Sequence, residues 1–333
     1  MNFTPCEKSG AVEGFALVRS CEKKNAKNGT VYLDMILSDK DSEIVAKLWD
    51  YKEDSFLPEA NTFIKVRGVL QQYNGKDQFV IQRMRPVCDG DNLKTEDFIK
   101  SSDFTGENMY SSLVALAQSF SDEELKKVVT SIYEEHKEEL LFFPAAEKLH
   151  HAMKGGLLYH TLSIVRLAEC VCSIYPAIDR ELLIAGAMLH DIAKLKEYTV
   201  NATGLVDGHS LEGMLLGHLV MGAEEVGRKC DELEVSEKTK TLLQHMLISH
   251  HGQLEYGAAV RPSFIEAEVL SQLDLFDANM YEMADAVSSV KADDFTGKLW
   301  MLDNRKFYNH GRTTAEPKAI LFETEEEQTN GMD

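Results

Sequence analysis

Short runs in which apolar and polar residues partly alternate dominate the first 88 positions of the chain. Three of these runs are rich in β-branched residues and cover 31–37, 43–49 and 63–70. Asn-Gly pairs at 28–29 and 74–75 stand between such runs, and this pair is a strong indicator of a hairpin turn. About five strands in about 80 residues are typical of a small barrel. Residues 1–88 are therefore predicted to form a β-barrel domain.

The pattern becomes helical after residue 107. Ser121-Asp-Glu-Glu124 is predicted to be a capping box that opens a helix, with apolar residues such as Leu125 and Val129 on one face. Further helices are predicted over 156–175, 180–194, 210–233, 237–249 and 263–281. The polar, aperiodic segment 89–102 is predicted to be a linker, residues 103–320 an all-α domain, and the acidic residues 321–333 a solvated tail.

Composition narrows the class of protein. Hydrophobic residues make up 44% and charged residues 27%, an ordinary soluble globular balance. The longest clean apolar run, 184–189, is far too short to span a bilayer, and the start of the chain lacks the features of a secretory signal. The six cysteines contain no CxxC pair, so we expect free thiols in a reducing cytosol. We therefore expect a cytoplasmic protein with no membrane partner, no disulfide framework and no zinc finger.

The charge is spread unevenly along the chain. A net charge of −20 argues against a simple basic nucleic-acid binder. Residues 1–88 hold 13 Lys and Arg against 12 Asp and Glu, a net of +1, whereas the remainder holds 22 against 43, a net of −21. This difference supports two domains, with the acidic bias in the second.

Histidine and aspartate carry the candidate chemistry, and ten of the eleven histidines lie between positions 136 and 251. His190-Asp191 stands near the end of an apolar helix, and an imidazole beside a carboxylate can share one divalent metal ion. Lys194 follows on the same helical face, where its ammonium is suited to a substrate phosphate or a metal-bound hydroxide. The same residue types recur in apolar surroundings at His160, His218, His250 with His251, and Asp274.

Each of these side chains alone is more often a satisfied residue of a core or of its boundary. Together they are different, because five predicted helices each place a His or an Asp among apolar residues, where a polar group needs a partner. Metal coordination would satisfy all of them at once. Mixed His and Asp ligands favour transition metals such as Mn, Fe or Zn over Mg.

A family resemblance rests on four motifs: HHAMKGGLLYHT (150–161), GAMLHDIAK (186–194), EGMLLGHLVMGAEEV (212–226) and SHHG (249–252). With Asp274 after them, they resemble the HD-domain metal-dependent phosphohydrolases, and more narrowly the YhaM-type 3′→5′ exoribonucleases. Those enzymes join an N-terminal OB-fold to a C-terminal HD domain. The resemblance covers nearly the full length and implies an OB-fold at 1–88 and an HD-type helical bundle at 103–320.

The resemblance also implies a ligand set for two divalent ions about 4 Å apart, with Mn²⁺ as the expected metal. It assigns His160, His190, Asp191 and Asp274 to the first ion, and His218, His250 and His251 to the second, with Asp191 able to bridge. Asp277 is the alternative to Asp274 as the last ligand. Catalysis is assigned to Asp191 and Lys194.

The activity implied by the resemblance is hydrolysis of single-stranded RNA from the 3′ end to nucleoside 5′-monophosphates, with single-stranded DNA as a second candidate substrate. Two alternatives stay open: a phosphohydrolase of small nucleotides, and a nucleic-acid-binding protein without activity. The barrel domain favours the nuclease over the hydrolase of small nucleotides, because a mononucleotide needs no separate binding domain. A homo-oligomer is compatible with the resemblance, but no heptad seam indicates an interface.

OB-folds commonly hold single strands by aromatic stacking and basic contacts along a groove. The candidate contact residues are Trp49, Tyr51, Lys65, Arg67, Tyr73 and Lys76, with Lys47, Arg83 and Phe79 as further candidates. Phe79 suits the barrel core equally well. The near-neutral charge of this region predicts moderate affinity with a shallow salt dependence.

Overall fold

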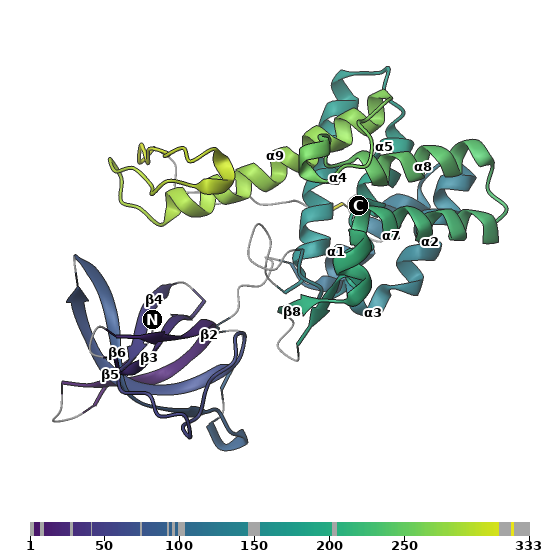
Figure 1. The fold of residues 1–333 in the computed structure, drawn as a ribbon. Helices are drawn as coiled ribbons and strands as arrows, with labels where there is room; N and C mark the ends of the chain where they lie inside the picture. Colours follow the sequence, from purple (N-terminus) through teal and green to yellow (C-terminus); the bar gives the residue numbers. More distant parts are fainter. Residues whose placement is uncertain are drawn as a thin grey trace, which may run out of the picture. The chain divides into compact units, whose positions relative to one another are not determined.

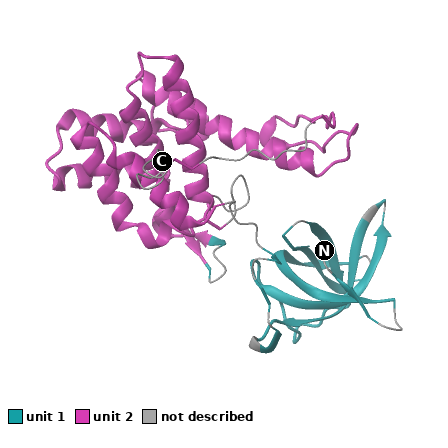
Figure 2. Ribbon diagram, turned by 180° about the vertical axis from the view of Figure 1, so that it is seen from behind, with its two compact units in different colours: residues 1–101, 201–207 teal, residues 102–200, 208–333 magenta. Residues whose placement is uncertain are grey.

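The computed structural model of the protein describes residues 3–6, 10–26, 29–40, 42–73, 75–91, 93–94, 97–98, 104–145, 154–201, 205–312 and 321–322. The chain divides into two compact units, one of residues 1–101 with 201–207 and the other of residues 102–200 with 208–333 (Figure 2). The predicted linker 89–102 therefore falls almost wholly in the first unit, where Asp89–Asp91 forms the short 3-10 helix η1.

The first unit is a closed β-barrel (Figure 1). Five strands follow one another in the spatial order β2-β3-β4-β6-β5, and pairing of β2 with β5 closes the ring. The β4–β6 pair is parallel and the other pairs are antiparallel. This is the small barrel expected from the alternating pattern, in the OB-like form that the family resemblance implies. The bounds of its strands are β1 Thr4–Pro5, β2 Val12–Asn25, β3 Val31–Ser38, β4 Glu43–Leu48, β5 Phe63–Tyr73 and β6 Lys76–Pro86.

Alternate side chains of the strands fill the barrel. Leu33, Met35 and Leu37 of β3 point inward and are at most 1% exposed. At Gly68, a β-bulge brings β5 so close to β6 that an added Cβ would lie 2.1 Å from the Val80 carbonyl oxygen. Glycine is therefore required at this bulge, because any side chain would push the two strands apart.

The second unit is built from helices around one large apolar core (Figure 1). A two-stranded sheet of β7 (Tyr198–Val200) and β8 (Val206–His209) interrupts the helical order. Helix α9 runs on beyond the rest of this unit, and residues 289–312 fold back at its far end (Figure 1). The helices are α1 Gly106–Gln118, α2 Glu123–Glu135, α3 Lys137–Leu140, α4 Gly156–Ile174, α5 Arg180–Leu189, α6 Lys194–Glu197, α7 Leu211–Glu232, α8 Glu237–Ser249 and α9 Ile265–Ser288.

The structure differs from the predicted elements at several helix ends, and the largest difference is that α9 runs to Ser288 rather than to 281. The helix predicted over 180–194 ends at Leu189, and a turn separates it from α6. The cap of α2 is Asp122 rather than Ser121, because the Asp122 carboxylate accepts the Glu124 and Leu125 N–H groups at 2.9 and 3.0 Å. The predicted capping box was therefore wrong by one residue.

The first two residues of the predicted acidic tail are packed. Leu321 and Phe322 lie against the helical core, and the Phe322 N–H donates to Ser112 Oγ at 2.6 Å. Burial of two apolar side chains explains why the chain returns to the core here. The glutamates from Glu323 onward lie outside the described residues.

Helix α4 is long and apolar enough to cross a membrane, judged by length and composition alone. Its buried side chains, such as Leu158, Leu162 and Val165, are fully covered by the core of the helical unit. We therefore interpret α4 as the central helix of that core.

Candidate metal centre

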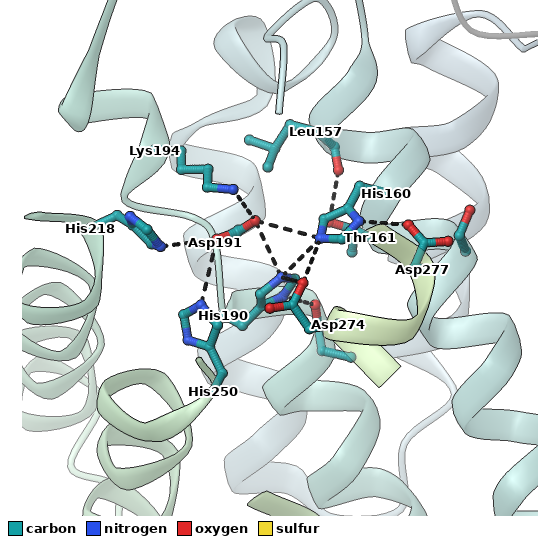
Figure 3. Close-up of polar contacts among 12 residues, drawn as sticks. Leu157, His160, Thr161, His190, Asp191, Lys194, His218, His250, Asp274 and Asp277 are labelled. Atoms are coloured by element: carbon teal, nitrogen blue, oxygen red, sulfur yellow. Dashed lines mark hydrogen bonds and ion pairs between the residues drawn. The ribbon is translucent and has the colours of Figure 1, made fainter. Parts of the chain in front are cut away.

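Five helices of the second unit bring His and Asp side chains to one buried position (Figure 3). The four imidazoles and Asp191 in this group are each at most 7% exposed. These side chains all belong to the predicted ligand set, so the residues that the sequence singled out do converge. They are His160 from α4, His190 and Asp191 from the end of α5, His218 from α7, His250 from the end of α8 and Asp274 from α9.

Asp191 lies between the histidines, and its two oxygens face different imidazoles. Oδ2 is 3.3 Å from His190 Nε2 and 3.6 Å from His160 Nε2. Oδ1 is 3.4 Å from His218 Nε2 and 3.7 Å from His250 Nε2. Ligand atoms about 2.1 Å from a shared ion lie roughly 3 to 3.5 Å apart, so these separations are close to those of a coordination shell.

The ends of two helices fix two of the imidazoles in the same way. His190 Nδ1 lies 2.8 Å from the Ala187 carbonyl oxygen, and His250 Nδ1 lies 2.8 Å from the Leu247 carbonyl oxygen. A carbonyl only accepts, so each Nδ1 carries the proton and each Nε2 presents a lone pair. Burial also lowers the pKa of His250 well below its usual range, so this ring is neutral. Both rings are therefore in the form that binds a metal.

His160 is held between two aspartates. Its Nδ1 lies 2.8 Å from Asp277 Oδ2, and its Nε2 lies 3.1 Å from Asp274 Oδ1. Burial disfavours the charged ring, but the hydrogen bonds with Asp274 and Asp277 outweigh it and raise the pKa of His160 to about 10. Asp274 faces the other ligands whereas Asp277 orients the far side of the ring, so the geometry favours Asp274 as the ligand.

The carboxylates of the centre are ionised. Burial raises the pKa of Asp191, but the charge of Lys194 and the neighbouring His190 hold that pKa well below its usual range. Burial also raises the pKa of Asp274, but the hydrogen bond with His160 outweighs burial and holds that pKa below its usual range. Both carboxylates therefore offer charged oxygens to a cation at a point that the apolar core surrounds.

Three atoms of the centre meet the chemical requirement for a bound cation. Asp191 Oδ1, His218 Nε2 and His250 Nε2 are buried and have no hydrogen-bond partner among the described residues. Leaving such groups unsatisfied costs free energy, and buried polar atoms in folded proteins are almost always paired. All three are lone-pair donors that face one another, so a divalent transition metal fits them.

Lys194 is buried and bound to the centre. Its ammonium lies 2.7 Å from Asp191 Oδ2. The residue as a whole is 8% exposed. Burial disfavours the ammonium, but the attraction of Asp191 raises the pKa of Lys194 above its usual range. The predicted continuous helical face for His190, Asp191 and Lys194 was wrong, because a turn separates Asp191 from α6, but the Lys194 side chain still reaches Asp191.

His251 lies at the rim of the centre. Its ring centroid is 5.1 Å from that of His218, and its Nδ1 lies 2.9 Å from the Tyr256 carbonyl oxygen. One nitrogen each of His218, His250 and His251 lie within 4.8 Å of one another. His251 therefore has the position expected of a third ligand on the His218 side.

Glu197, at the end of α6, was missed by the sequence analysis. Its carboxylate binds His218, with Oε2 2.9 Å from His218 Nδ1. A pattern could have shown it, because Asp191, Lys194 and Glu197 follow one another at intervals of three residues. His150 and His151 of the first motif lie outside the described residues.

A second group of potential ligands has other partners. Glu225 Oε1 lies 2.6 Å from His136 Nε2, and its Oε2 lies 2.9 Å from Lys196 Nζ. The nearby Glu135 is paired with Lys229. Two ammonium groups neutralise these carboxylates, so we interpret the group as an ion-pair network that ties α2, α6 and α7 together.

The barrel residues predicted to contact nucleic acid are only partly available. Trp49 and Tyr73 are 43% and 62% exposed, as a stacking residue must be. Tyr51 is 7% exposed, and its hydroxyl donates to the Ser55 carbonyl oxygen at 2.8 Å. Its prediction as an exposed stacking residue was therefore wrong, because the ring completes the barrel core. Phe79 is fully buried in the same core.

Lys65 and Arg67 of β5 and Arg83 of β6 lie close together, because the register places Arg67 opposite Arg83 and Lys65 opposite Arg85. Lys65 is paired with Glu13 at 2.9 Å, and Arg67 is engaged in a further contact. Lys76 begins β6, and its side chain lies outside the described part of the chain. Lys47 Nζ lies over the rings of Tyr32 and Trp49 at 4.9 and 5.5 Å, and 3.6 Å from Asp34 Oδ1.

Solved structures resemble the chain only in part. A replication protein A heterotrimer bound to ssDNA is 22% identical and covers 25% of this chain and 62% of its own, with a TM-score of 0.21. The second OB-fold domain of replication protein A from Methanococcus maripaludis is 18% identical and covers 25% of this chain and 86% of its own, with a TM-score of 0.20. Scores of this size support no argument about this chain.

Family models match parts of the chain, and curated relatives match most of it. The HD domain model matches residues 157–279, and the TraI_2 helicase model matches residues 109–180. A protein named 3′-5′ exoribonuclease YhaM from Bacillus subtilis (strain 168) is 33% identical over 298 residues, 89% of this chain and 94% of its own. The protein of that name from Oceanobacillus iheyensis is 35% identical over 300 residues, 89% of this chain and 93% of its own. The chain belongs to the YhaM family of 3′-5′ exoribonucleases, with an HD domain in its helical unit.

Proposed function

We propose that this protein is a metal-dependent 3′-5′ exoribonuclease whose active site is the buried His and Asp centre. The curated relatives named 3′-5′ exoribonuclease match this chain over nearly their full length. The observation that carries the proposal is the set of three buried atoms, Asp191 Oδ1, His218 Nε2 and His250 Nε2, that lack hydrogen-bond partners among the described residues. A cation there would satisfy all three and attract a phosphodiester to this acidic unit.

The ligands divide between the two oxygens of Asp191, and we propose one ion on each side. His160, His190 and Asp274 stand on the Oδ2 side, whereas His218, His250 and His251 stand on the Oδ1 side. Divalent ions, when bound, activate water and neutralise the charge of the phosphate. Imidazole nitrogens dominate both sides, which favours a transition metal, and we propose Mn²⁺, with Fe and Zn as alternatives.

The protein's own side chains would position these ions and the substrate. The ion pair with Lys194 holds Asp191 in place and takes one of the three N–H donors of the ammonium. We propose that a second donor binds an oxygen of the scissile phosphate. The Nδ1 hydrogen bonds of His160, His190 and His250 fix their rings, so their Nε2 atoms stay directed at the ions.

The barrel would hold the single-stranded part of the substrate. Tyr32 and Trp49 have ring centroids 4.7 Å apart, with Lys47 over both rings. Exposed aromatic rings stack on bases of any identity, and an ammonium beside them suits the phosphate backbone. We propose single-stranded RNA as the substrate, single-stranded DNA as a second one, and nucleoside 5′-monophosphates as products.

The proposal is tested by a time course on single-stranded RNA labelled at the 5′ end or at the 3′ end, with Mn²⁺ and with EDTA. A 3′-5′ exonuclease shortens the 5′-labelled RNA stepwise and releases the 3′ label at once as a mononucleotide. EDTA should stop both. If free nucleotides are hydrolysed while RNA stays intact, the protein is instead a phosphohydrolase of small nucleotides. Intact RNA and nucleotides with bound metal would contradict both activities. A cytoplasmic location and a homo-oligomer stay predictions from the sequence.

A further inference from the structure

Glu197 is a buried acidic residue that stands behind the metal ligands. The residue is 7% exposed and closes α6. Both oxygens of its carboxylate face His218: Oε2 lies 2.9 Å from the ring Nδ1, and Oε1 lies 3.3 Å from the backbone nitrogen. One carboxylate therefore binds two donors of the same residue.

The backbone of α7 is interrupted at the point where this double contact forms. Gly217 has φ 72° and ψ 161°, which interrupts the helix directly before His218. The interruption turns the His218 N–H away from the helical hydrogen-bond ladder and toward Glu197. A residue with a side chain rarely adopts this positive φ, so glycine is required at position 217.

The main chain of Glu197 is also fixed against the start of α7. Its carbonyl oxygen accepts the Ser210 N–H at 2.9 Å. A Cβ added at Gly213 would lie 2.3 Å from the same oxygen, so the two backbones are in contact. The position of the carboxylate is therefore determined by the fold and not by a free side chain.

The double contact determines the state of the His218 ring. A carboxylate only accepts, so Nδ1 must carry the proton and Nε2 must present its lone pair. That Nε2 is one of the three buried atoms without a hydrogen-bond partner among the described residues, and it lies 3.4 Å from Asp191 Oδ1. The carboxylate thus directs a lone pair into the Oδ1 side of the centre.

We propose that Glu197 is a positioning residue that sets the metal affinity of the His218 side without touching metal or substrate. The inference rests on the two-ion arrangement proposed above. It predicts that the two sides of the centre respond differently, because the His160 side takes its orientation from Asp277 instead. Loss of Glu197 should weaken one ion and leave the other.

The informative variant is Glu197→Gln. An amide has one acceptor and one donor group, so it leaves one of the two His218 donors facing another N–H whichever way it turns. Partners of this kind are worth about 10- to 100-fold in metal affinity. Glu197→Asp retains both acceptors on a shorter side chain and should recover part of the loss.

A matched control is available at Glu181. Its two oxygens also accept two N–H groups, those of Ser121 and Asp122, at 2.8 Å each, but on another part of the helical unit. Glu181→Gln therefore removes the same type of contact without involving a metal ligand. Any loss of affinity that arises from general loosening of the unit should appear in both variants.

The experiment is calorimetric titration of EDTA-stripped, full-length protein with Mn²⁺. We expect two classes of site in the wild type and in Glu181→Gln, and about 10- to 100-fold weaker binding of one class in Glu197→Gln. In a His218→Ala background, Glu197→Gln should cause no further loss of metal affinity. A structural role would lower affinity further in that background.

Two results would overturn the inference: unchanged binding of both ions in Glu197→Gln, or an equal further loss in the His218→Ala background. If the wild type binds a single ion, the two-ion part of the proposed function is wrong. The role of Glu197 then fails as well only if the affinity for that ion is unchanged in Glu197→Gln. Should Glu197→Gln not fold, Glu197→Asp is titrated in its place, and a smaller loss confined to the same class of site is expected.

Discussion

Asp191 is the residue on which the arrangement of the centre depends. It lies 3.3 to 3.7 Å from the nitrogens of four imidazoles and 2.7 Å from the Lys194 ammonium. Its Oδ2 faces His160 and His190, and its Oδ1 faces His218 and His250. A change at this single carboxylate should therefore affect both groups of histidines at once.

Asp191→Asn is expected to weaken metal binding by about 100-fold or more and to abolish RNA hydrolysis, because a neutral amide places N–H donors against imidazole lone pairs. Metal content after gel filtration and the 5′-labelled RNA assay measure the two effects. Asp303→Asn, at an exposed aspartate of the same unit, is the control. Normal turnover by Asp191→Asn would remove the centre from consideration as the active site.

The sequence predicted the ligands of the centre better than the residues that orient them. His and Asp in apolar helices are conspicuous, because burial without a partner is costly. Glu197 is conspicuous only through its three-residue spacing from Lys194 and Asp191, since one glutamate near the end of a helix is ordinarily solvated. Tyr51 was predicted to contact nucleic acid but belongs to the core. The sequence could not show this, because an aromatic residue of a small barrel has the same pattern whether it faces the core or the solvent.

Among the elements, the four-residue helix α6 connects the centre to the rest of the helical unit. Lys194 binds Asp191, Lys196 binds Glu225, and Glu197 binds His218. Glu225 in turn binds His136 at the end of α2. The periodic pattern predicted one helix here and could not show the turn before α6, because residues of a buried turn are as apolar as those of a buried helix.

The contact of α6 with α7 predicts a pH-dependent stability. Burial raises the pKa of Glu225, but the hydrogen bonds with His136 and Lys196 outweigh it and lower that pKa to about 2, from an ordinary value of 4.5. A lowered pKa in the folded state stabilises the protein above about pH 4.5, and the contribution is lost as the pH falls toward 2. It amounts to roughly 3 kcal/mol at neutral pH.

Glu225→Gln should therefore lower the free energy of unfolding strongly at pH 7 and by a smaller amount as the pH approaches 3. Urea unfolding of wild type and variant at several pH values measures the difference. Glu224→Gln, at the exposed neighbouring position, should change little at any pH. A difference between wild type and Glu225→Gln that is independent of pH would show that the charge of Glu225 is not what stabilises the unit.

At the scale of the whole molecule, the distribution of charge indicates that one part binds the RNA strand and another part hydrolyses it. The protein carries a net charge of −20, yet the first 88 residues are close to neutral. An acidic unit repels a phosphate backbone except where bound cations reverse the local charge. Most of the affinity for a long strand should therefore come from the barrel, and base stacking rather than charge should dominate it.

This division predicts that Trp49→Ala weakens binding of a long single-stranded RNA but leaves hydrolysis of a dinucleotide unchanged. Loss of one stacked base costs about 1 to 3 kcal/mol, which corresponds to about 5- to 150-fold in affinity. Fluorescence anisotropy with labelled RNA, in the inactive Asp191→Asn background, measures binding without degradation.

The only other tryptophan, Trp300, is 70% exposed on the segment beyond α9, so Trp300→Ala is a matched control. If Trp300→Ala weakens binding as much, or if dinucleotide hydrolysis falls together with RNA binding in Trp49→Ala, the barrel is not the part that holds the strand.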